Sequence, residues 1–278
     1  MKRLYDEVAY SCSKLVTRQY STSFSLGIFL LGKKIHNPIY AIYGFVRLAD
    51  EIVDSFHDFD KAKLLNEFIA DTHKSIEERI SLNPILNAFQ AVVHRYQIDM
   101  ELINTFLKSM EMDLNQKDYD TAGLEAYILG SAEVVGLMCL KVFVDRDEAE
   151  YQRLKPSAMR LGAAFQKVNF LRDLQADYEG LGRTYFPEVS MDAFNEQQKE
   201  KVEREIREDF KAALEGIRQL PKVARLGVYS AYVYYLHLFK KIRKTKANRI
   251  IEERIRIPNW QKLWLTFGCL LKTRMNLI

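Results

Sequence analysis

The sequence predicts an all-α protein, and three observations support this fold class. Apolar residues recur every three or four positions over long stretches, whereas the alternation typical of strands is rare. Glycine and proline are scarce, with 12 and 6 residues respectively, which argues against an all-β fold rich in tight turns. Five of the six prolines stand where a helix would begin or a connection would run, and Pro187 after "GRTYF" marks a break.

The elements follow from the apolar repeat and from these prolines. The apolar repeat alone predicts helices over 4–19, 60–80, 100–116, 122–145 and 195–219. A proline at or near the start supports five more: Pro38 for 38–56, Pro84 for 84–96, Pro156 for 153–179, Pro221 for 222–246 and Pro258 for 259–275. No linker or internal repeat divides the chain, so we expect one helical domain over residues 1–278.

Composition excludes several classes of protein. The net charge of +4 is too small to indicate a nucleic-acid partner by itself. Cys12, Cys139 and Cys269 are far apart, and the histidines form no metal-binding motif, which predicts a reducing, cytoplasmic setting and no zinc site. The start "MKRLYDEVAYSC" lacks a signal-peptide core, and the apolar run "VVGLMCLKVFV" is too short to span a membrane and contains Lys141.

A first acidic stripe lies in "FVRLADEIVDSF", residues 45–56. Asp50 and Asp54 are four positions apart and share one helical face, with Arg47 three positions before Asp50. Glu51 belongs to a neighbouring stripe. Apolar residues flank both aspartates, so this face is not expected to be fully solvated.

A second stripe lies in "FQKVNFLRDLQADYEGLGRTYFP", residues 165–187. Asn169, Asp173 and Asp177 stand at i, i+4 and i+8, which aligns three oxygen-bearing side chains over two turns. Arg172 and Gln166 lie close to this stripe, and apolar residues surround it.

The two stripes together indicate a cation. One acidic pair usually occupies a solvated face, and Arg47 with Asp50 could be an ordinary ion pair. In a partly buried cleft, however, two carboxylates about 6 Å apart repel by roughly 3 kcal/mol at an effective dielectric constant near 20. Oxygen ligands suit Mg²⁺, which commonly takes one or two carboxylates and substrate phosphates. The pattern therefore favours a metal–diphosphate site.

Four blocks carry a family resemblance: "YSTSFSLGIFLL", "AIYGFVRLADEIVD", "YILGSAEVVGLM" and the second acidic stripe. In this order they resemble the squalene/phytoene synthase family over residues 11–257, and bacterial phytoene synthases most. The resemblance implies an isoprenoid-synthase-type helical bundle around a central active-site cavity. It also implies head-to-head condensation of two prenyl diphosphates with Mg²⁺, or with Mn²⁺ as the alternative ion.

The resemblance assigns roles by position. The metal ligands are Asp50, Asp54, Asn169, Asp173 and Asp177. The catalytic residues are these four aspartates with Tyr127 and Arg172, and the substrate-binding residues are Arg47, Arg172, Tyr235, Arg183, Tyr20, Phe24 and Gln166. Two departures stand out: Glu51 occupies the second position of a motif that often reads Asp-Asp-x-x-Asp, and Thr22 stands where the family can carry a diphosphate-binding lysine.

We expect phytoene formation from two geranylgeranyl diphosphates, the first committed step of carotenoid biosynthesis, through a cyclopropyl diphosphate. The nearest alternative uses farnesyl diphosphate to make squalene or dehydrosqualene, and a non-catalytic helical assembly factor is more distant. The absence of a glycine-rich nucleotide loop favours a reaction without NADPH. Further wall residues are expected at Phe45, Phe165 and Phe170, and Gly130, Ala132 and Gly136 either let helices approach or leave room for a chain.

The C-terminal segment carries a stripe that could dock on the core or on lipid. It consists of Trp260, Leu263, Trp264, Phe267, Leu270 and Leu271, with Lys262, Lys272 and Arg274 nearby. The basic run "KKIRKTKANR", residues 240–249, lacks the interleaved aromatic residues of a nucleic-acid site and is expected to be solvated or to face a membrane. Peripheral membrane contact is therefore an expectation, and oligomeric state is left open.

Overall fold

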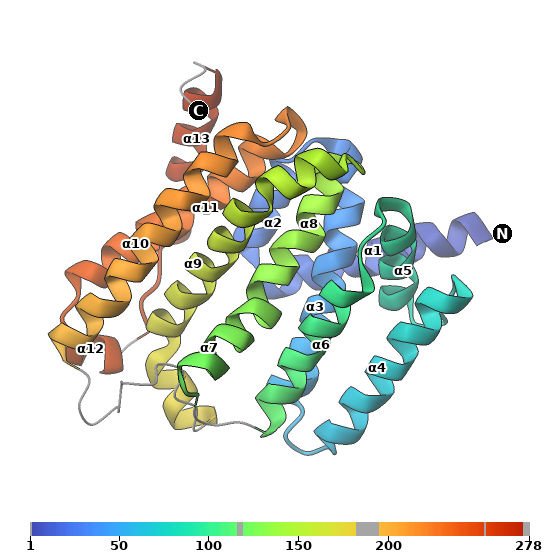
Figure 1. Ribbon diagram of the computed structural model, residues 1–278, viewed down its shortest axis with the longest axis horizontal. Coiled ribbons are helices and arrows are strands. Elements are labelled where there is room, and N and C mark those ends of the chain that lie inside the picture. Colours follow the sequence, from blue (N-terminus) through green and yellow to red (C-terminus); the bar gives the residue numbers. More distant parts are fainter. Residues whose placement is uncertain (1, 116–118, 182–194, 253, 275–278) are drawn as a thin grey trace.

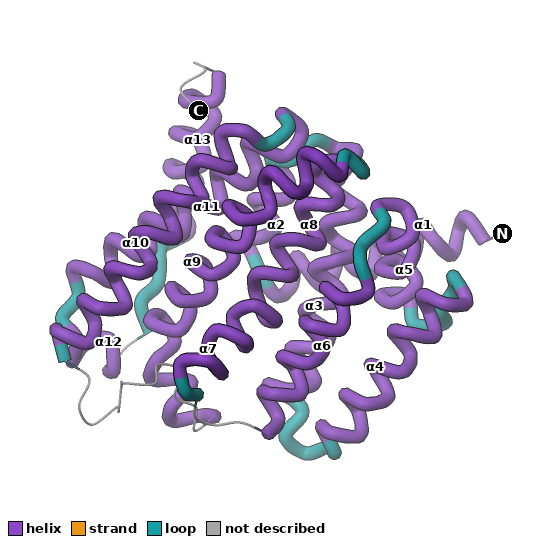
Figure 2. Tube along the Cα trace, in the orientation of Figure 1, coloured by secondary structure: helices purple, strands orange, loops and turns teal. Residues whose placement is uncertain are grey.

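The computed structural model describes residues 2–115, 119–181, 195–252 and 254–274, and these residues form helices joined by short loops, with no strand among them (Figures 1 and 2). The all-α prediction is confirmed. The first part of the bundle comprises α1 (Lys2–Tyr20), α2 (Thr22–Phe29), a 3₁₀ turn η1 (Lys33–Ile35), α3 (His36–Ser55), α4 (Lys61–Glu78), α5 (Pro84–Tyr96) and α6 (Met100–Asn115).

The second part contains the longest helices. It comprises α7 (Thr121–Ile128), a π-helical turn η2 (Leu129–Glu133), α8 (Val134–Val144), α9 (Glu148–Leu181), α10 (Glu196–Gln219), α11 (Lys222–Lys244), α12 (Ala247–Glu252) and α13 (Asn259–Arg274). In Figure 1, α4 and α6 lie on one side and α10 and α12 on the other, with α8 and α9 between them.

The core centres on α3, which is buried along most of its length and packs against α1, α4, α5, α6 and α8. Phe45 of α3 is fully buried and stacks on Phe89 of α5 with ring centroids 3.9 Å apart. Phe68 and Phe106 complete this aromatic cluster. The expectation that Phe45 lines the cavity is therefore wrong, because the apolar face of α3 that carries it turns toward α4, α5 and α6.

Local signals explain most helix boundaries. Asn83 caps α5 by accepting hydrogen bonds from the backbone of Ile85 and Leu86, with Pro84 in the first turn. Asn195 and Gln198 form a capping box at the start of α10. Both helices begin within one residue of the predicted positions.

Three differences from the predicted elements have physical causes. Helix α9 begins at Glu148 and passes through Pro156, because a proline removes only one backbone hydrogen bond and the packing of α9 against α8 and α10 holds the helix together. Helices α2 and α12, of 8 and 6 residues, are too short for the apolar repeat to reveal. The segment predicted as one helix over 122–145 contains a π-helical turn at Leu129–Glu133.

One stretch, Thr121–Val144, is long and apolar enough by length and composition to cross a membrane. More than half of its most apolar window, 56%, is buried inside the protein. A buried core helix passes the same test, so the stretch is weak evidence for a membrane span.

Candidate active site

Two adjoining cavities lie between α3, η2, α9 and the C-terminal helices. The larger has a volume of about 570 Å³ and a mainly apolar wall, and the smaller, of about 340 Å³, is lined mostly by charged and polar side chains. We call them the apolar cavity and the charged pocket. Both are lined by Arg47, Asp50, Ser131, Gln166, Asn169, Arg172 and Arg254.

The first acidic stripe faces the charged pocket. Asp50 and Asp54 project from α3, and Asp113 of α6 joins them in the wall. Burial raises the pKa of Asp50 to about 7, the charges of Asp54, Asp113 and Glu51 add to the rise, and Arg47 opposes it. Burial and the neighbouring carboxylates thus both oppose the charged form of Asp50.

Arg47 is held by three neighbours at the boundary of the two cavities. Its Nη2 atom donates to Glu51 one helical turn later, and its Nη1 atom lies 4.0 Å from Oδ2 of Asp50. The guanidinium also lies over the ring of Tyr20, 4.4 Å from the centroid. The sequence predicted that Arg47 contacts diphosphate and does not serve only as an ion-pair partner of Asp50. The structure combines an ion pair to Glu51 with a position in the wall of both cavities.

The second stripe faces the same pocket from α9, through Asn169 and Asp173. The Oδ1 atom of Asn169 is buried and has no hydrogen-bond partner among the described residues. Asp173 is paired twice: Nε of Arg172 donates to its Oδ1 at 3.0 Å, and Nε of Arg254 approaches that atom to 2.6 Å. The two acidic stripes thus converge on one pocket.

The Asp173 pair also affects Arg172. Burial alone would lower the pKa of Arg172, but the hydrogen bonds and the charge of Asp173 outweigh burial and raise it above its ordinary value. Arg172 therefore remains a cation in the pocket wall. Two predicted residues cannot be placed: the side chain of Asp177 and the whole of Arg183 lie outside the described residues.

Tyr127 lines the charged pocket, as its predicted position in the active site requires. Its hydroxyl donates to Oδ2 of Asp113 at 3.0 Å, and its ring lies between those of Tyr119 and Phe170, at centroid distances of 5.1 and 6.1 Å. Sequence reasoning missed Asp113. A signal existed, because Asp113 follows Phe106 and Met110 on the buried face of α6, where an acid is unusual.

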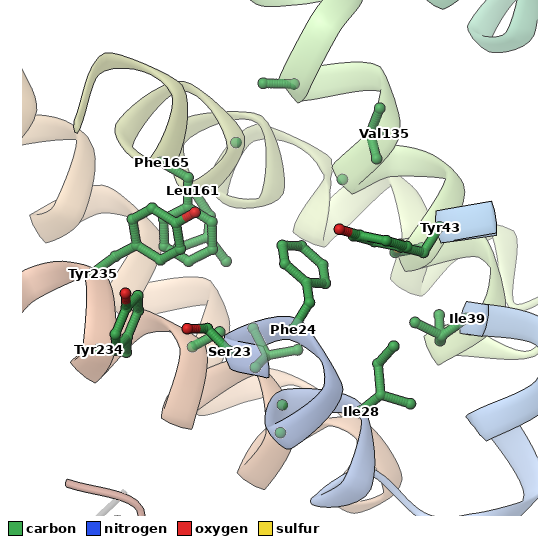
Figure 3. A pocket seen from close by; sticks show the side chains of 18 of the residues that line it. Ser23, Phe24, Ile28, Ile39, Tyr43, Val135, Leu161, Phe165, Tyr234 and Tyr235 are labelled. Carbon is green, nitrogen blue, oxygen red and sulfur yellow. The ribbon is translucent and has the colours of Figure 1, made fainter. Parts of the chain in front are cut away.

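Aromatic side chains shape the apolar cavity (Figure 3). The ring of Phe24 points into the space between Tyr43 and the pair formed by Phe165 and Tyr235. Phe165 stacks on Tyr235 at 3.9 Å, and Phe24 lies 5.0 Å from Tyr43. Tyr235 was predicted to contact diphosphate. It lines the apolar cavity, and its pKa is raised by burial.

The small residues of "GSAEVVG" divide into two groups. A side chain at Gly130 would collide with Ser109 and with the carbonyl of Thr105, so this glycine lets η2 approach α6 closely. Ala132 and Gly136 line the apolar cavity, and a Cβ atom at Gly136 would meet only the carbonyl of Ala158, at 3.4 Å. Gly136 therefore widens the cavity, as one of the two sequence interpretations proposed.

Two cations reach the site from the end of the chain. Arg254 lines both cavities, and Lys262 of α13 lines the apolar cavity and donates from Nζ to Oγ1 of Thr22 at 3.2 Å. A lysine from another helix thus contacts the threonine at the position where the resemblance suggested a lysine. Neither residue was predicted to reach the site, and Lys262 was noted only beside the C-terminal apolar stripe, because their approach depends on how the C-terminal segment folds back.

In the part of the chain that the structure describes, no three His, Cys, Asp or Glu side chains lie close enough together to form a metal site by themselves. Two short carboxylate stripes face each other instead, with arginines among them. A charged pocket beside an apolar cavity suits an amphiphile whose head is a polyanion and whose tail is a hydrocarbon. The fold and site thus define a helical protein that can bind such ligands between its helices.

The chain belongs to the squalene/phytoene synthase family, whose family model matches residues 17–261, so it is of the prenyltransferase type. It is 26% identical over 277 residues to a 4,4′-diapophytoene synthase of Staphylococcus haemolyticus, covering 92% of this chain and 94% of that protein. It is 28% identical over 283 residues to a 15-cis-phytoene synthase of Synechococcus elongatus, covering 92% and 90% of the two chains.

Solved structures support the fold. A dehydrosqualene synthase in complex with a ligand is similar with a TM-score of 0.82 and 20% identity, covering 97% of this chain and 98% of that chain. The squalene synthase HpnC of Alicyclobacillus acidocaldarius is similar with a TM-score of 0.76 and 19% identity, over 87% and 95% of the two chains. The predicted family and helical architecture are confirmed.

Proposed function

We propose that this protein condenses two molecules of geranylgeranyl diphosphate head-to-head to phytoene, through a cyclopropyl (prephytoene) diphosphate. The observation that carries the proposal is the charged pocket beside the apolar cavity, with Arg47, Asp50 and Arg172 in the wall of both. Members of the family at 26 to 28% identity include both phytoene and diapophytoene synthases, so the length of the prenyl chain is part of the proposal.

The head of the substrate is expected in the charged pocket. Arg47, Arg172 and Arg254 offer forked donors that suit diphosphate oxygens. Glu51 and Tyr20 hold Arg47 in place, so little side-chain entropy is lost when the head binds. Arg254 contacts Asp173, and we expect it to exchange this carboxylate for a phosphate when substrate binds.

The donor set fits Mg²⁺. Asp50, Asp54, Asn169 and Asp173 present only oxygen ligands to the pocket. The buried Oδ1 of Asn169, which has no hydrogen-bond partner among the described residues, and the raised pKa of Asp50 both fit a site that binds a cation. These residues, with Asp177, would hold the ion, which when bound supplies charge neutralisation to the departing diphosphate.

The chemistry breaks two carbon–oxygen bonds. The C1–O bond of one substrate breaks, diphosphate leaves with the electron pair, and Arg47 and Arg172 stabilise its charge. The allylic cation is attacked by the alkene of the second substrate, and loss of one proton closes the cyclopropane. The second diphosphate then leaves, the skeleton rearranges, and loss of another proton gives a conjugated triene without a hydride donor.

The apolar cavity protects these cations. Phe24, Phe165 and Tyr43 exclude water, which would otherwise add to the cation. The π faces of these aromatic rings stabilise positive charge at close range. Tyr127 and Tyr235 are assigned to hydrogen bonding with diphosphate or to the same cations.

The alternative is a farnesyl diphosphate enzyme that makes squalene or dehydrosqualene. The similarity to a diapophytoene synthase supports this alternative. Purified protein incubated with either diphosphate, with and without Mg²⁺ and NADPH, separates these outcomes by the hydrocarbon that is extracted into hexane. We expect a C40 triene that needs Mg²⁺ and not NADPH. A C30 product alone would refute the geranylgeranyl assignment, and no hydrocarbon under any condition would refute the enzyme.

A further inference from the structure

Helix α13 has two chemically different faces. Its inner face contributes Lys262, Leu265 and Thr266 to the apolar cavity, and Cys269 is buried against the bundle. Its outer face exposes large apolar side chains at helical spacing: Trp260 61%, Trp264 68%, Phe267 53% and Leu271 46%. The rings of Trp264 and Phe267 meet edge to face at 6.3 Å. The side chains of Leu263, Lys272 and Arg274, part of the predicted stripe, lie outside the described residues.

An exposed apolar face of this extent is unusual for a helix that borders only water. Single exposed apolar residues are common, but a contiguous stripe marks a surface that contacts a partner or a membrane. Figure 1 shows α13 at one end of the molecule, beside α11. In this position the outer face is exposed and no helix among the described residues covers it, while the inner face closes part of the apolar cavity.

Charge identifies the partner. Residues 254–278 contain five basic residues and no aspartate or glutamate. Arg254 and Lys262 face the cavities, whereas Arg256 is exposed, and Lys272 and Arg274 follow at the end of α13. A basic segment with tryptophans on its apolar face suits an anionic lipid surface, because aromatic rings favour the boundary between headgroups and acyl chains. A second copy of this chain suits it less, since a two-fold interface would bring the same basic residues together.

We propose that α13 is an interfacial helix that docks this protein on anionic bilayers, with Trp260, Trp264 and Phe267 in the headgroup region. With 16 residues, α13 is about 24 Å long, shorter than a hydrocarbon core of about 30 Å, so it lies along the surface and does not span. The purpose of docking, release of the product into the bilayer, rests on the proposed function. The hydrocarbon product carries no charged group, and α13 lies between the product's cavity and the lipid.

The two tryptophans of the chain make this testable without any substrate. Both lie on the outer face of α13, so intrinsic tryptophan fluorescence reports this helix alone. On addition of phosphatidylcholine vesicles containing phosphatidylglycerol, we expect emission to move to shorter wavelength and the protein to float with the vesicles. Pure phosphatidylcholine vesicles are expected to bind more weakly, and added salt to weaken binding to the anionic ones.

A matched pair of variants locates the contact. Trp264→Glu is expected to reduce vesicle affinity at least roughly tenfold, because it removes a large apolar anchor and adds a negative charge. Phe59→Glu is the control, since Phe59 lies between α3 and α4 with the same exposure, 68%. Circular dichroism checks that both variants fold.

Three results would overturn the proposal: no flotation with anionic vesicles, equal loss of binding in both variants, or a blue shift that depends on protein concentration before vesicles are added. The last result would assign the face to a second copy of the chain. None of these readouts depends on turnover, so a failure of the proposed reaction would be recognised separately, by the absence of a hydrocarbon product in the extraction assay.

Discussion

The acidic faces of α3 and α9 have nearly the same sequence pattern, yet their carboxylates have different partners. Asp173 on α9 is paired with Arg172 and Arg254. Among the described residues, the ion-pair partner of Asp50 on α3 is Arg47 at 4.0 Å, and Arg47 makes its closer contact with Glu51. The α9 carboxylate is therefore paired with two arginines, whereas the α3 carboxylate has one more distant guanidinium, and burial raises its pKa to about 7.

This difference suggests that the two stripes have different roles when the cation and the diphosphate bind. Asp50 of the α3 stripe would give up only a 4.0 Å contact with Arg47 on binding a cation, whereas Asp173 of the α9 stripe would have to release two closer arginines. Those arginines are then free to bind the anion that accompanies the metal. On this hypothesis, substrate and ion together replace the pairs between arginines and carboxylates inside the pocket.

The largest expected effect comes from removing either carboxylate. Asp50→Ala and Asp173→Ala should each reduce turnover by roughly a thousandfold or more, because both stripes are needed to hold the cation against the leaving diphosphate. The helical circular dichroism signal should persist. Asp71→Ala, on an exposed face of α4, is the control that should leave turnover unchanged. Turnover retained in one of the two variants would restrict the metal site to the other stripe.

An intermediate effect is expected at Arg254. Arg254→Ala should reduce kcat/KM by roughly ten- to a hundredfold, because it removes a charge-assisted contact to diphosphate. Arg256→Ala, two residues away and exposed, serves as the matched control and should change kcat/KM little. Equal kinetics for the two variants would mean that Arg254 only screens Asp173 and does not bind substrate.

The smallest expected effect is on the free energy of unfolding, and replacing an aspartate by asparagine should change it in opposite directions in the two stripes. The pKa of Asp50 is raised from 3.8 to about 7, so the folded state binds its proton more tightly and this stabilisation is lost as pH rises from about 4 to 7. Without Mg²⁺ at pH 8, Asp50→Asn should therefore raise the free energy of unfolding by about 1–2 kcal/mol. Asp173→Asn should lower it by about 1–3 kcal/mol, because Arg172 loses its partner.

Urea unfolding of both asparagine variants, at pH 5 and pH 8, measures this difference. At pH 5 the stabilisation by Asp50→Asn should largely disappear, since Asp50 is then protonated in the folded protein. Shifts of the same sign for the two variants at pH 8 would show that the stripes do not differ in the way their partners suggest.

Much of the fold could be predicted, because helix formation is local. The 3–4 repeat located the long helices, and prolines such as Pro84 marked where some of them begin. The repeat could not predict that α9 continues through Pro156, since the lost hydrogen bond is offset by packing against α8 and α10. Nor could it show that Phe45 enters the core while Phe24 faces the cavity.

The sequence by itself determined the helical class and the two acidic stripes, because residues four apart on a helix share a face wherever that helix lies. Only the tertiary structure decided that both stripes face one pocket, that Arg254 pairs with Asp173, and that Lys262 contacts Thr22, 240 residues away in the chain. The periodicity of a helix defines the face on which a side chain lies. It does not define which side chains of other helices contact that residue, and these contacts set the charge state of a carboxylate.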